Sequence, residues 1–260
     1  MDLVHGLSGL LVGTLVGLTG VGGGSLMAPI LIMLLGVSPA TAVGTDLWFA
    51  AITKMAGGAV HQSVGQPDWT VVKRLAIGSV PASILTSIIL FEIDSGQIKH
   101  GLIITALGTI LLLTAAAMFS WSRVQKAVLN LGPRRTALCR RHQPALTVFC
   151  GILLGVTVTL TSIGAGALGA VMLMALYPLR MSGSRLVGTD IVHAIPLTIV
   201  AGMGHFIMGN VDFGLLGMLL VGSIPGIIIG SLLAARMPPV LLRSILALVL
   251  GATGFKMIMG

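Results

Sequence analysis

The stretch FGLLGMLLVGSIPGIIIGSLLAA, at residues 213–235, contains no charged residue. An apolar run of about 18 or more residues is typical of a helix that crosses a lipid bilayer. A second run, at 98–118, carries no charge after Lys99. These two runs predict a helical membrane protein.

The composition of the whole chain agrees with this prediction. Of the 260 residues, 55% are hydrophobic and only 8% are charged, whereas soluble domains carry roughly 25% charged residues. The net charge of +8 would suggest nucleic acid in a soluble protein, but here membrane topology explains it, so we expect no nucleic-acid partner. Two cysteines, Cys139 and Cys150, are too few for a disulfide framework or a metal site.

The chain repeats itself at a fixed spacing. With an offset of 144 residues, SPATAVGTD at 38–46 matches SGSRLVGTD at 182–190, and GSVP at 78–81 matches GSIP at 222–225. With an offset of 142, TGVGGGSL at 19–26 matches TSIGAGAL at 161–168. Such internal repeats are typical of membrane transporters. We therefore predict a first membrane repeat at 1–118, a basic connector at 119–144 and a second membrane repeat at 145–260.

Each half contains the same four parts. An apolar segment broken by glycines comes first, at 3–36 and again at 145–177. A second segment begins at Ser38 or Ser182, a residue type that commonly caps the start of a helix. Two more apolar segments complete each half, at about 70–91 and 98–118, and at about 214–235 and 240–258. Asp68 and Asp212 precede the third segments and are predicted to cap them.

The basic residues predict how the halves face. Positively charged loops stay in the cytoplasm, and the connector carries six basic residues: Arg123, Lys126, Arg134, Arg135, Arg140 and Arg141. If the segment at 145–177 is a hairpin that returns to the side where it began, Arg180, Arg185, Arg236 and Arg243 also lie inside. Each half then crosses the membrane an odd number of times. The prediction is an all-α fold of two inverted repeats, each with a broken hairpin and three transmembrane helices, giving eight to ten membrane helices and termini outside.

The glycine-rich breaks are candidate anion sites. The first contains Gly20, Gly22, Gly23, Gly24 and Ser25, and the second contains Ser162, Gly164 and Gly166. Glycines let backbone N–H groups approach a ligand closely, and the first turn of the next helix has unsatisfied donors and a positive partial charge. Helix packing alone is the competing explanation for the glycines. Recurrence in both halves favours anion binding, with Thr45 and Thr189 as further candidates.

Asp46 and Asp190 each end a Gly-Thr-Asp motif about seven residues into a membrane helix. An ionisable group at such depth is costly and indicates a function. A carboxylate repels a bound anion unless it is protonated or paired, so proton coupling is one interpretation. A structural carboxylate bonded to backbone at a helix break is the other.

Lys54 and His193 complete the charged candidates. Lys54 follows Asp46 by eight residues, on nearly the same helix face, and its counterpart is Thr198. It could neutralise Asp46, attract substrate or extend toward the lipid interface. His193 lies one turn after Asp190, where packing competes with a role in charge relay. His61 and His205 match each other, and we expect packing or capping from them.

These residues resemble the TauE/SafE family, the sulfite exporter family of membrane proteins. The resemblance covers nearly the whole chain and rests on GLTGVGGGSLMAPIL at 17–31, AVGTD at 42–46, VHQSVGQPDW at 60–69 and LVGTDIVHAIPLTIVAG at 186–202. It implies ATP-independent efflux, or sometimes uptake, of sulfite, sulfoacetate or related anions. Many members have Gly-Thr-Ser where this chain has Gly-Thr-Asp.

The sequence therefore predicts a secondary transporter, most simply an exporter, of a small sulfur oxyanion such as sulfite or an organosulfonate across the cell membrane. A channel or importer for another small anion, such as a carboxylate, is the alternative. No nucleophile–base pair or metal-ligand cluster stands out, so we expect neither an enzyme, nor a cofactor, nor a metal. The expected partners are the anion, the bilayer and a coupling proton or sodium ion, and a homodimer is open.

Overall fold

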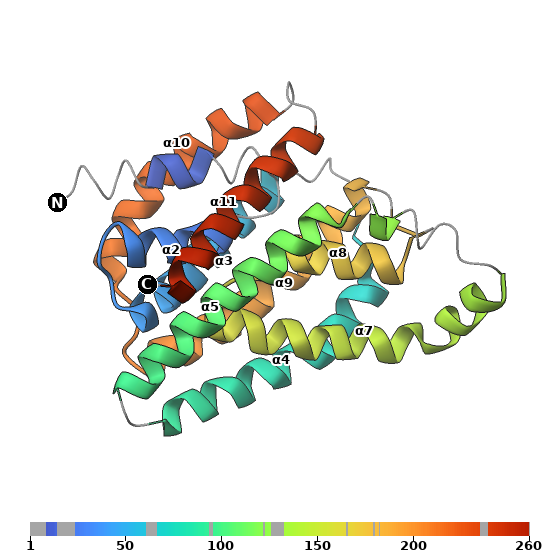
Figure 1. Cartoon of the computed structure of the whole chain (residues 1–260), viewed down its shortest axis with the longest axis horizontal. Helices are drawn as coiled ribbons and strands as arrows, with labels where there is room; N and C mark the ends of the chain where they lie inside the picture. The colour runs from blue at the N-terminus through green and yellow to red at the C-terminus, as the bar shows by residue number, and fades with distance from the viewer. Residues whose placement is uncertain are drawn as a thin grey trace.

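The structure is a computed structural model that describes residues 9–14, 24–60, 67–93, 96–121, 123–125, 133–164, 166–178, 180–181, 183–234 and 239–259. These residues form helices and no strand (Figure 1). The labelled helices are α2 (Gly24–Met33), α3 (Pro39–Val60), α4 (Trp69–Glu92), α5 (Gly96–Phe119), α7 (Pro133–Thr161), α8 (Ala167–Leu176), α9 (Gly183–Ile207), α10 (Phe213–Ala234) and α11 (Pro239–Met259).

Five helices of the described chain are long and apolar enough to cross a membrane. They lie within α4, α5, α7, α9 and α10, and α11 adds a shorter apolar helix. Their outward faces carry large apolar side chains, among them Phe91, Val221 and Leu248, as expected where lipid replaces water. The prediction of a polytopic all-α membrane protein is confirmed, while the number of eight to ten spans stays a prediction.

Two pairs of equivalent helices, α3 with α9 and α5 with α11, pack against each other and run antiparallel. In α3 and α9, Gly44 lies against His205, and the Trp48 indole N–H donates to the Gly202 carbonyl at 3.1 Å. In α5 and α11, Gly108 faces Ile258 and Ala115 faces Gly251. The predicted inverted repeat would give equivalent helices opposite directions, and the inverted repeat itself stays a prediction. Which side of the membrane each loop occupies stays a prediction.

The helices pack across the repeat boundary, and small residues allow it. On α7, Gly151 lies against the backbone of Leu75 and Gly155 against that of Ser79, both on α4. The helical segment 9–14 repeats this contact on α10. Such small-xxx-small spacing permits close helix approach in lipid. The contact pairs repeat at the sequence offsets, since Gly9 and Gly13 lie against Leu219 and Ser223.

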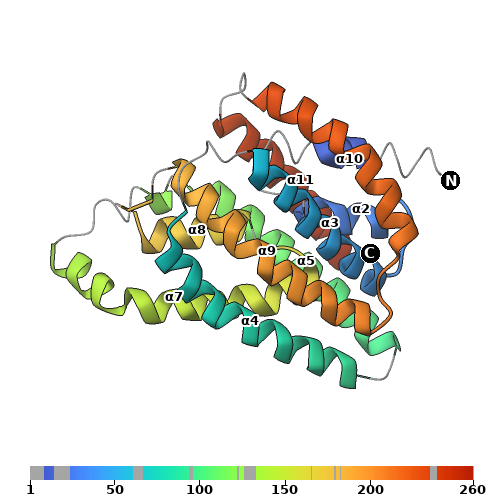
Figure 2. The same ribbon diagram turned by 180° about the vertical axis from the view of Figure 1, so that it is seen from behind.

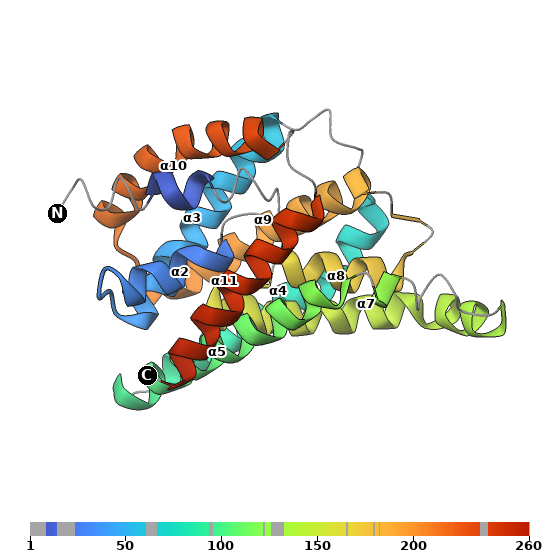
Figure 3. The same cartoon turned by 45° about the horizontal axis from the view of Figure 1, so that its top comes forward.

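Helices α3 and α9 lie at the centre of the molecule (Figure 2). Helices α4 and α7 pack together on one side and α10 lies on the other, so each side combines elements of both halves. Helices α5 and α11 form a further pair (Figure 3). A site between α3 and α9 is therefore enclosed by elements from both repeats.

The second broken segment is a hairpin. Helix α7 runs to Thr161, and α8 runs back beside it. Two contacts show this return: the Gln143 side chain donates to the Leu176 carbonyl, and Thr147 Oγ1 lies 2.7 Å from the Tyr177 hydroxyl. As predicted, the chain comes back to the level at which the hairpin began. Helix α7 begins at Pro133, so residues 133–144 of the predicted connector belong to this helix.

Candidate functional site

The tip of the hairpin is a buried break in the backbone. Ser162 has φ +59°, and Gly164 and Gly166 have φ +123° and +142°, conformations that bulky side chains rarely adopt. Ser162 is 3% exposed, and its hydroxyl has no hydrogen-bond partner among the described residues. Gly166 caps α8 without a side-chain hydrogen bond. The tip therefore presents a buried hydroxyl beside an uncapped helix N-terminus, which favours an anion.

Asp46 on α3 faces this tip from the first repeat. Its side chain is completely buried, and no described residue meets hydrogen-bond geometry at either carboxylate oxygen. The Ser162 hydroxyl and the Ala28 backbone N–H, in the second turn of α2, are the polar groups that act on it. Ser162 belongs to the second repeat and Ala28 to the first. Asp46 therefore lies between the broken segments of both repeats.

Asp190 takes the equivalent position on α9. It is 5% exposed, and its Oδ1 atom lies so close to Gly169 that a Cβ there would meet it within 3 Å. Gly169 lies in the first turn of α8, and its N–H donates to the Gly164 carbonyl at 2.9 Å. No described residue donates a hydrogen bond to Asp190 Oδ1. Each acid therefore lies beside the short helix that follows its own repeat's break.

Lys54 and His193 join the two acids in one buried cluster. Lys54 is 4% exposed and interacts electrostatically with both Asp46 and Asp190. His193 is completely buried near Lys54, and its Nε2 lies 2.9 Å from the Ser79 hydroxyl. The structure thus brings together the four residues that the sequence offered as charge-coupling candidates. Their role in transport stays a prediction.

The two threonines of the Gly-Thr-Asp motifs have other partners. Thr189 Oγ1 accepts from the Asp68 backbone N–H at 3.0 Å and donates to the Arg185 carbonyl, and Thr45 Oγ1 accepts from the Asp212 N–H at 3.1 Å. These hydroxyls join each repeat to the helix start of the other, a contact that motif position alone did not reveal. Their predicted role in binding substrate remains untested.

The remaining predicted residues have mixed outcomes. Gly20, Gly22 and Gly23 lie outside the described residues, as does His61, while Gly24 and Ser25 open α2. Ser38 caps α3, with its Oγ accepting from Thr41 N–H at 3.3 Å. The aspartate caps are also confirmed, since Val71 N–H and Leu215 N–H donate to Asp68 Oδ1 and Asp212 Oδ1.

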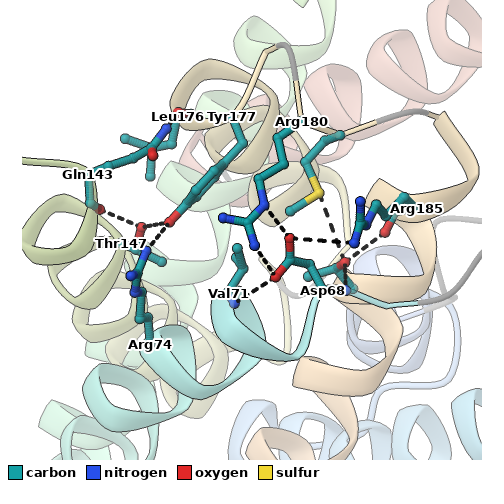
Figure 4. A network of polar contacts seen from close by, with 11 residues as sticks. Asp68, Val71, Arg74, Gln143, Thr147, Leu176, Tyr177, Arg180 and Arg185 are labelled. Carbon is teal, nitrogen blue, oxygen red and sulfur yellow. Dashed lines mark hydrogen bonds and ion pairs between the residues drawn. The ribbon is translucent and has the colours of Figure 1, made fainter. Parts of the chain in front are cut away.

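An ion-pair network was not predicted from the sequence. We call the end of the molecule formed by Asp68, Arg74, Gln143, Tyr177 and Arg180 the connector end (Figure 4). There Arg180 forms an ion pair with Asp68, with Nε 2.6 Å from Oδ2 and Nη2 donating to Oδ1 at 2.9 Å. Arg185 adds a contact at 3.9 Å. Asp68 had been read only as a helix cap, and sequence spacing gave no sign that the loop after α8 reaches it.

A hydrogen-bonded layer closes the same end. The Tyr177 hydroxyl lies 2.7 Å from Thr147 Oγ1 and accepts from Arg74 at 3.3 Å. The Arg180 guanidinium lies 6.0 Å from the centre of the Tyr177 ring, within the range of a cation–π contact. Tyr177 is the largest completely packed side chain of the described protein, at 1% exposure. At the connector end, hydrogen bonds and a cation–π contact therefore surround the buried Tyr177 at the end of the hairpin.

Comparisons with known proteins agree with this architecture. The family model described as "Sulfite exporter TauE/SafE" matches residues 6–257. "Probable membrane transporter protein YjnA" of Bacillus subtilis (strain 168) is 42% identical over 216 residues, which cover 82% of this chain and 83% of the relative. "Probable membrane transporter protein MJ0441" of Methanocaldococcus jannaschii is 27% identical over 211 residues, covering 78% and 72%. No solved structure matches with significance. The chain therefore belongs to the sulfite exporter TauE/SafE family and is a multi-pass membrane transporter.

Proposed function

We propose that this transporter is a secondary carrier, and in the cell an exporter, of a small sulfur oxyanion such as sulfite or an organosulfonate. The observation that supports the anion most directly is the buried tip of the hairpin, where the Ser162 hydroxyl faces Asp46 and lies near the N-terminus of α8. The matching family's description supports sulfur chemistry.

The neighbouring charges support a carrier that moves a proton with the anion. Asp46 and Asp190 lie beside the two short helices, where a bound anion would repel two ionised carboxylates. Protonation of one of them removes this repulsion, so anion and proton stabilise each other's binding. An exporter of this kind releases an acid produced inside the cell down its own gradient, together with the proton.

Counterflow tests the proposal. Liposomes containing the purified protein are loaded with unlabelled sulfite and diluted into a trace of ³⁵S-sulfite, while acetate-loaded liposomes are diluted in parallel into a trace of ¹⁴C-acetate. A carrier gives a transient, saturable accumulation of label in the sulfite-loaded liposomes. Label that enters without saturation or counterflow would indicate a channel, and counterflow of acetate but not sulfite would support the carboxylate alternative.

The Ser162→Ala variant tests the site. It removes a hydroxyl that lies beside Asp46 but meets hydrogen-bond geometry with no described residue, so folding should be largely preserved, whereas a hydrogen bond to a charged ligand contributes about 1.5–3 kcal/mol. We expect the half-saturating sulfite concentration to rise at least about tenfold. Thr253→Ala is the matched control, because that hydroxyl donates to the Val249 carbonyl within α11. If both variants transport sulfite with the same kinetics, the anion does not bind at this tip.

A further inference from the structure

Lys54 lies on α3, near the point where α3 and its counterpart α9 are level with each other. Gly44 lies level with His205, and Trp48 with Gly202, in the antiparallel pair of α3 and α9. Continuing this register by five residues brings Thr53 level with Leu197, its equivalent at the offset of 144. The pseudo-two-fold axis that relates the repeats therefore passes beside Lys54, and an acid lies eight residues before it on α3 and eight before Thr198 on α9.

This position gives one lysine two symmetry-related partners. Asp46 and Asp190 both act electrostatically on Lys54, and all three side chains are at most 5% exposed. Among the described residues, Lys54 is the one Lys or Arg that is buried to this degree. The other titratable group facing it is His193 on α9, which α4 contacts through Ser79. Within the described part of the chain, the two acids therefore share a single buried Lys or Arg.

The charge count of the empty site follows from these residues. If both acids are ionised, two carboxylates and one ammonium sum to one negative charge. The N-termini of α2 and α8 each contribute a positive partial charge of about one half, which together offset it. An anion that binds at those N-termini adds a second negative charge in a buried site, where uncompensated charge is strongly unfavourable.

We infer that Lys54, shared between Asp46 and Asp190, sets the number of protons carried with each monovalent anion to one. In the loaded site Lys54 pairs with one acid and the other acid holds the proton. This inference rests on the proposed anion carrier and adds to it the group that fixes its coupling ratio. It makes a prediction that a purely structural lysine does not make.

The prediction is rescue by a second neutralisation. Asp190→Asn removes one negative charge, so the empty site becomes positive and accepts an anion without a proton. Removing Lys54 as well restores the original balance, and the remaining acid again needs a proton when the anion binds. The same reasoning applies to Asp46→Asn. Lys54→Thr, which installs the residue type of its counterpart Thr198, is the substitution that removes this positive charge.

Isethionate accumulation measures this ratio. Isethionate is a fully ionised monovalent sulfonate, and the liposomes are sodium-free and clamped at zero membrane potential with potassium and valinomycin. One proton per anion gives about tenfold accumulation per unit of pH gradient, alkaline inside. We expect about tenfold accumulation for the wild type, no accumulation for Asp46→Asn or Asp190→Asn, and about tenfold again for each acid variant combined with Lys54→Thr. Combination with Lys73→Thr, an exposed lysine on α4, is the matched control and should not rescue.

The outcomes separate the two ideas. Wild-type protein that exchanges isethionate without responding to the pH gradient, or that needs sodium to accumulate it, would overturn the inference and leave the carrier standing. Acid variants that fold and exchange isethionate but regain no accumulation with Lys54→Thr would also overturn it. A wild type that exchanges neither sulfite nor isethionate would overturn the proposed function itself. Each acid is tested in its own double variant with Lys54→Thr. If one double variant misfolds, the other still tests the inference.

Discussion

At both ends of the molecule a threonine of the Gly-Thr-Asp motif accepts a hydrogen bond from the aspartate that caps the next helix. Thr189 receives it from Asp68 at the connector end, and Thr45 receives it from Asp212 at the opposite end. Beyond this bond the ends differ. Asp68 is 3% exposed and paired with Arg180, whereas Asp212 is exposed and forms no ion pair within the described chain.

The difference comes from residues that the two repeats do not share. At the offset of 144, Arg180 corresponds to Gly36 and Arg185 to Thr41. The duplicated residues give the two ends equivalent hydrogen bonds to a backbone N–H. The arginines that only the second repeat carries add ion pairs at one end. We expect the connector end to be the more stable closure and the opposite end to open more readily. Three sets of variants test this comparison.

The largest effect should come from the helix crossings, where the halves are expected to behave alike. Any Cβ at Gly155 would lie within 3 Å of Ser79 and Ala82 atoms, and one at Gly13 would meet the backbone of Ser223. Gly155→Val and Gly13→Val should each destabilise the protein by about 3 kcal/mol or more, because overpacking forces the helices apart. Yield and thermal midpoint in detergent measure the loss.

Gly101→Ala is the control for these variants, since no atom lies within 4 Å of the added Cβ. If Gly13→Val keeps a normal thermal midpoint while Gly155→Val loses it, the two equivalent helix crossings contribute unequally to stability.

An intermediate effect should distinguish the two ends. Asp68→Asn keeps a helix-capping side chain but leaves Arg180 and Arg185 without their carboxylate. Arg180 is 45% exposed, so solvent screens part of the interaction, and we expect a loss of about 1–2 kcal/mol that shrinks in high salt. Asp212→Asn should change the free energy of unfolding by less than about 0.5 kcal/mol.

A double-variant cycle with Arg180→Gln isolates the pair. If Asp68→Asn and Asp212→Asn shift the thermal midpoint equally at every salt concentration, the ion pairs contribute nothing and the ends are equivalent.

The smallest effect should again be equal at the two ends. Thr189→Val and Thr45→Val each remove the acceptor of one backbone N–H, at Asp68 and Asp212. A lost hydrogen bond of this kind costs about 1 kcal/mol, so both midpoints should fall slightly and by similar amounts. Thr86→Val, whose hydroxyl donates only within α4, is the matched control. A much larger loss for Thr189→Val would mean that the ion pair and this bond act as one unit.

The fold was largely predictable because its signals are local in sequence. Apolar runs located the spans, the repeat offset gave the pairing of Gly44 and Asp46 with Gly188 and Asp190, and the cap residues Ser38, Asp68 and Asp212 were read correctly. The four charged candidates were found because ionisable residues within apolar helices are rare.

The network at the connector end was not predictable in the same way. The partner of Asp68 lies 112 residues away, and only the return of α8 beside α7 brings Arg180 to it. Tyr177 gave no pattern at all, since its hydroxyl matters through Thr147 and Arg74, which lie on different helices. The same reason explains the missed bonds of Thr45 and Thr189, whose partners lie in the other repeat.

The close packing of α4 against α7 has a consequence for how the protein is made. Residues Gly78, Ser79 and Ser83 of α4 are buried against α7, yet α7 ends roughly 70 residues after α4 does. At a synthesis rate of about 5–20 residues per second, α4 waits about 4–14 s for its partner. During that interval its serine-bearing face meets lipid or an insertion factor instead of protein. The folding of this chain in the membrane therefore depends on protecting one helix until the ribosome has delivered the other.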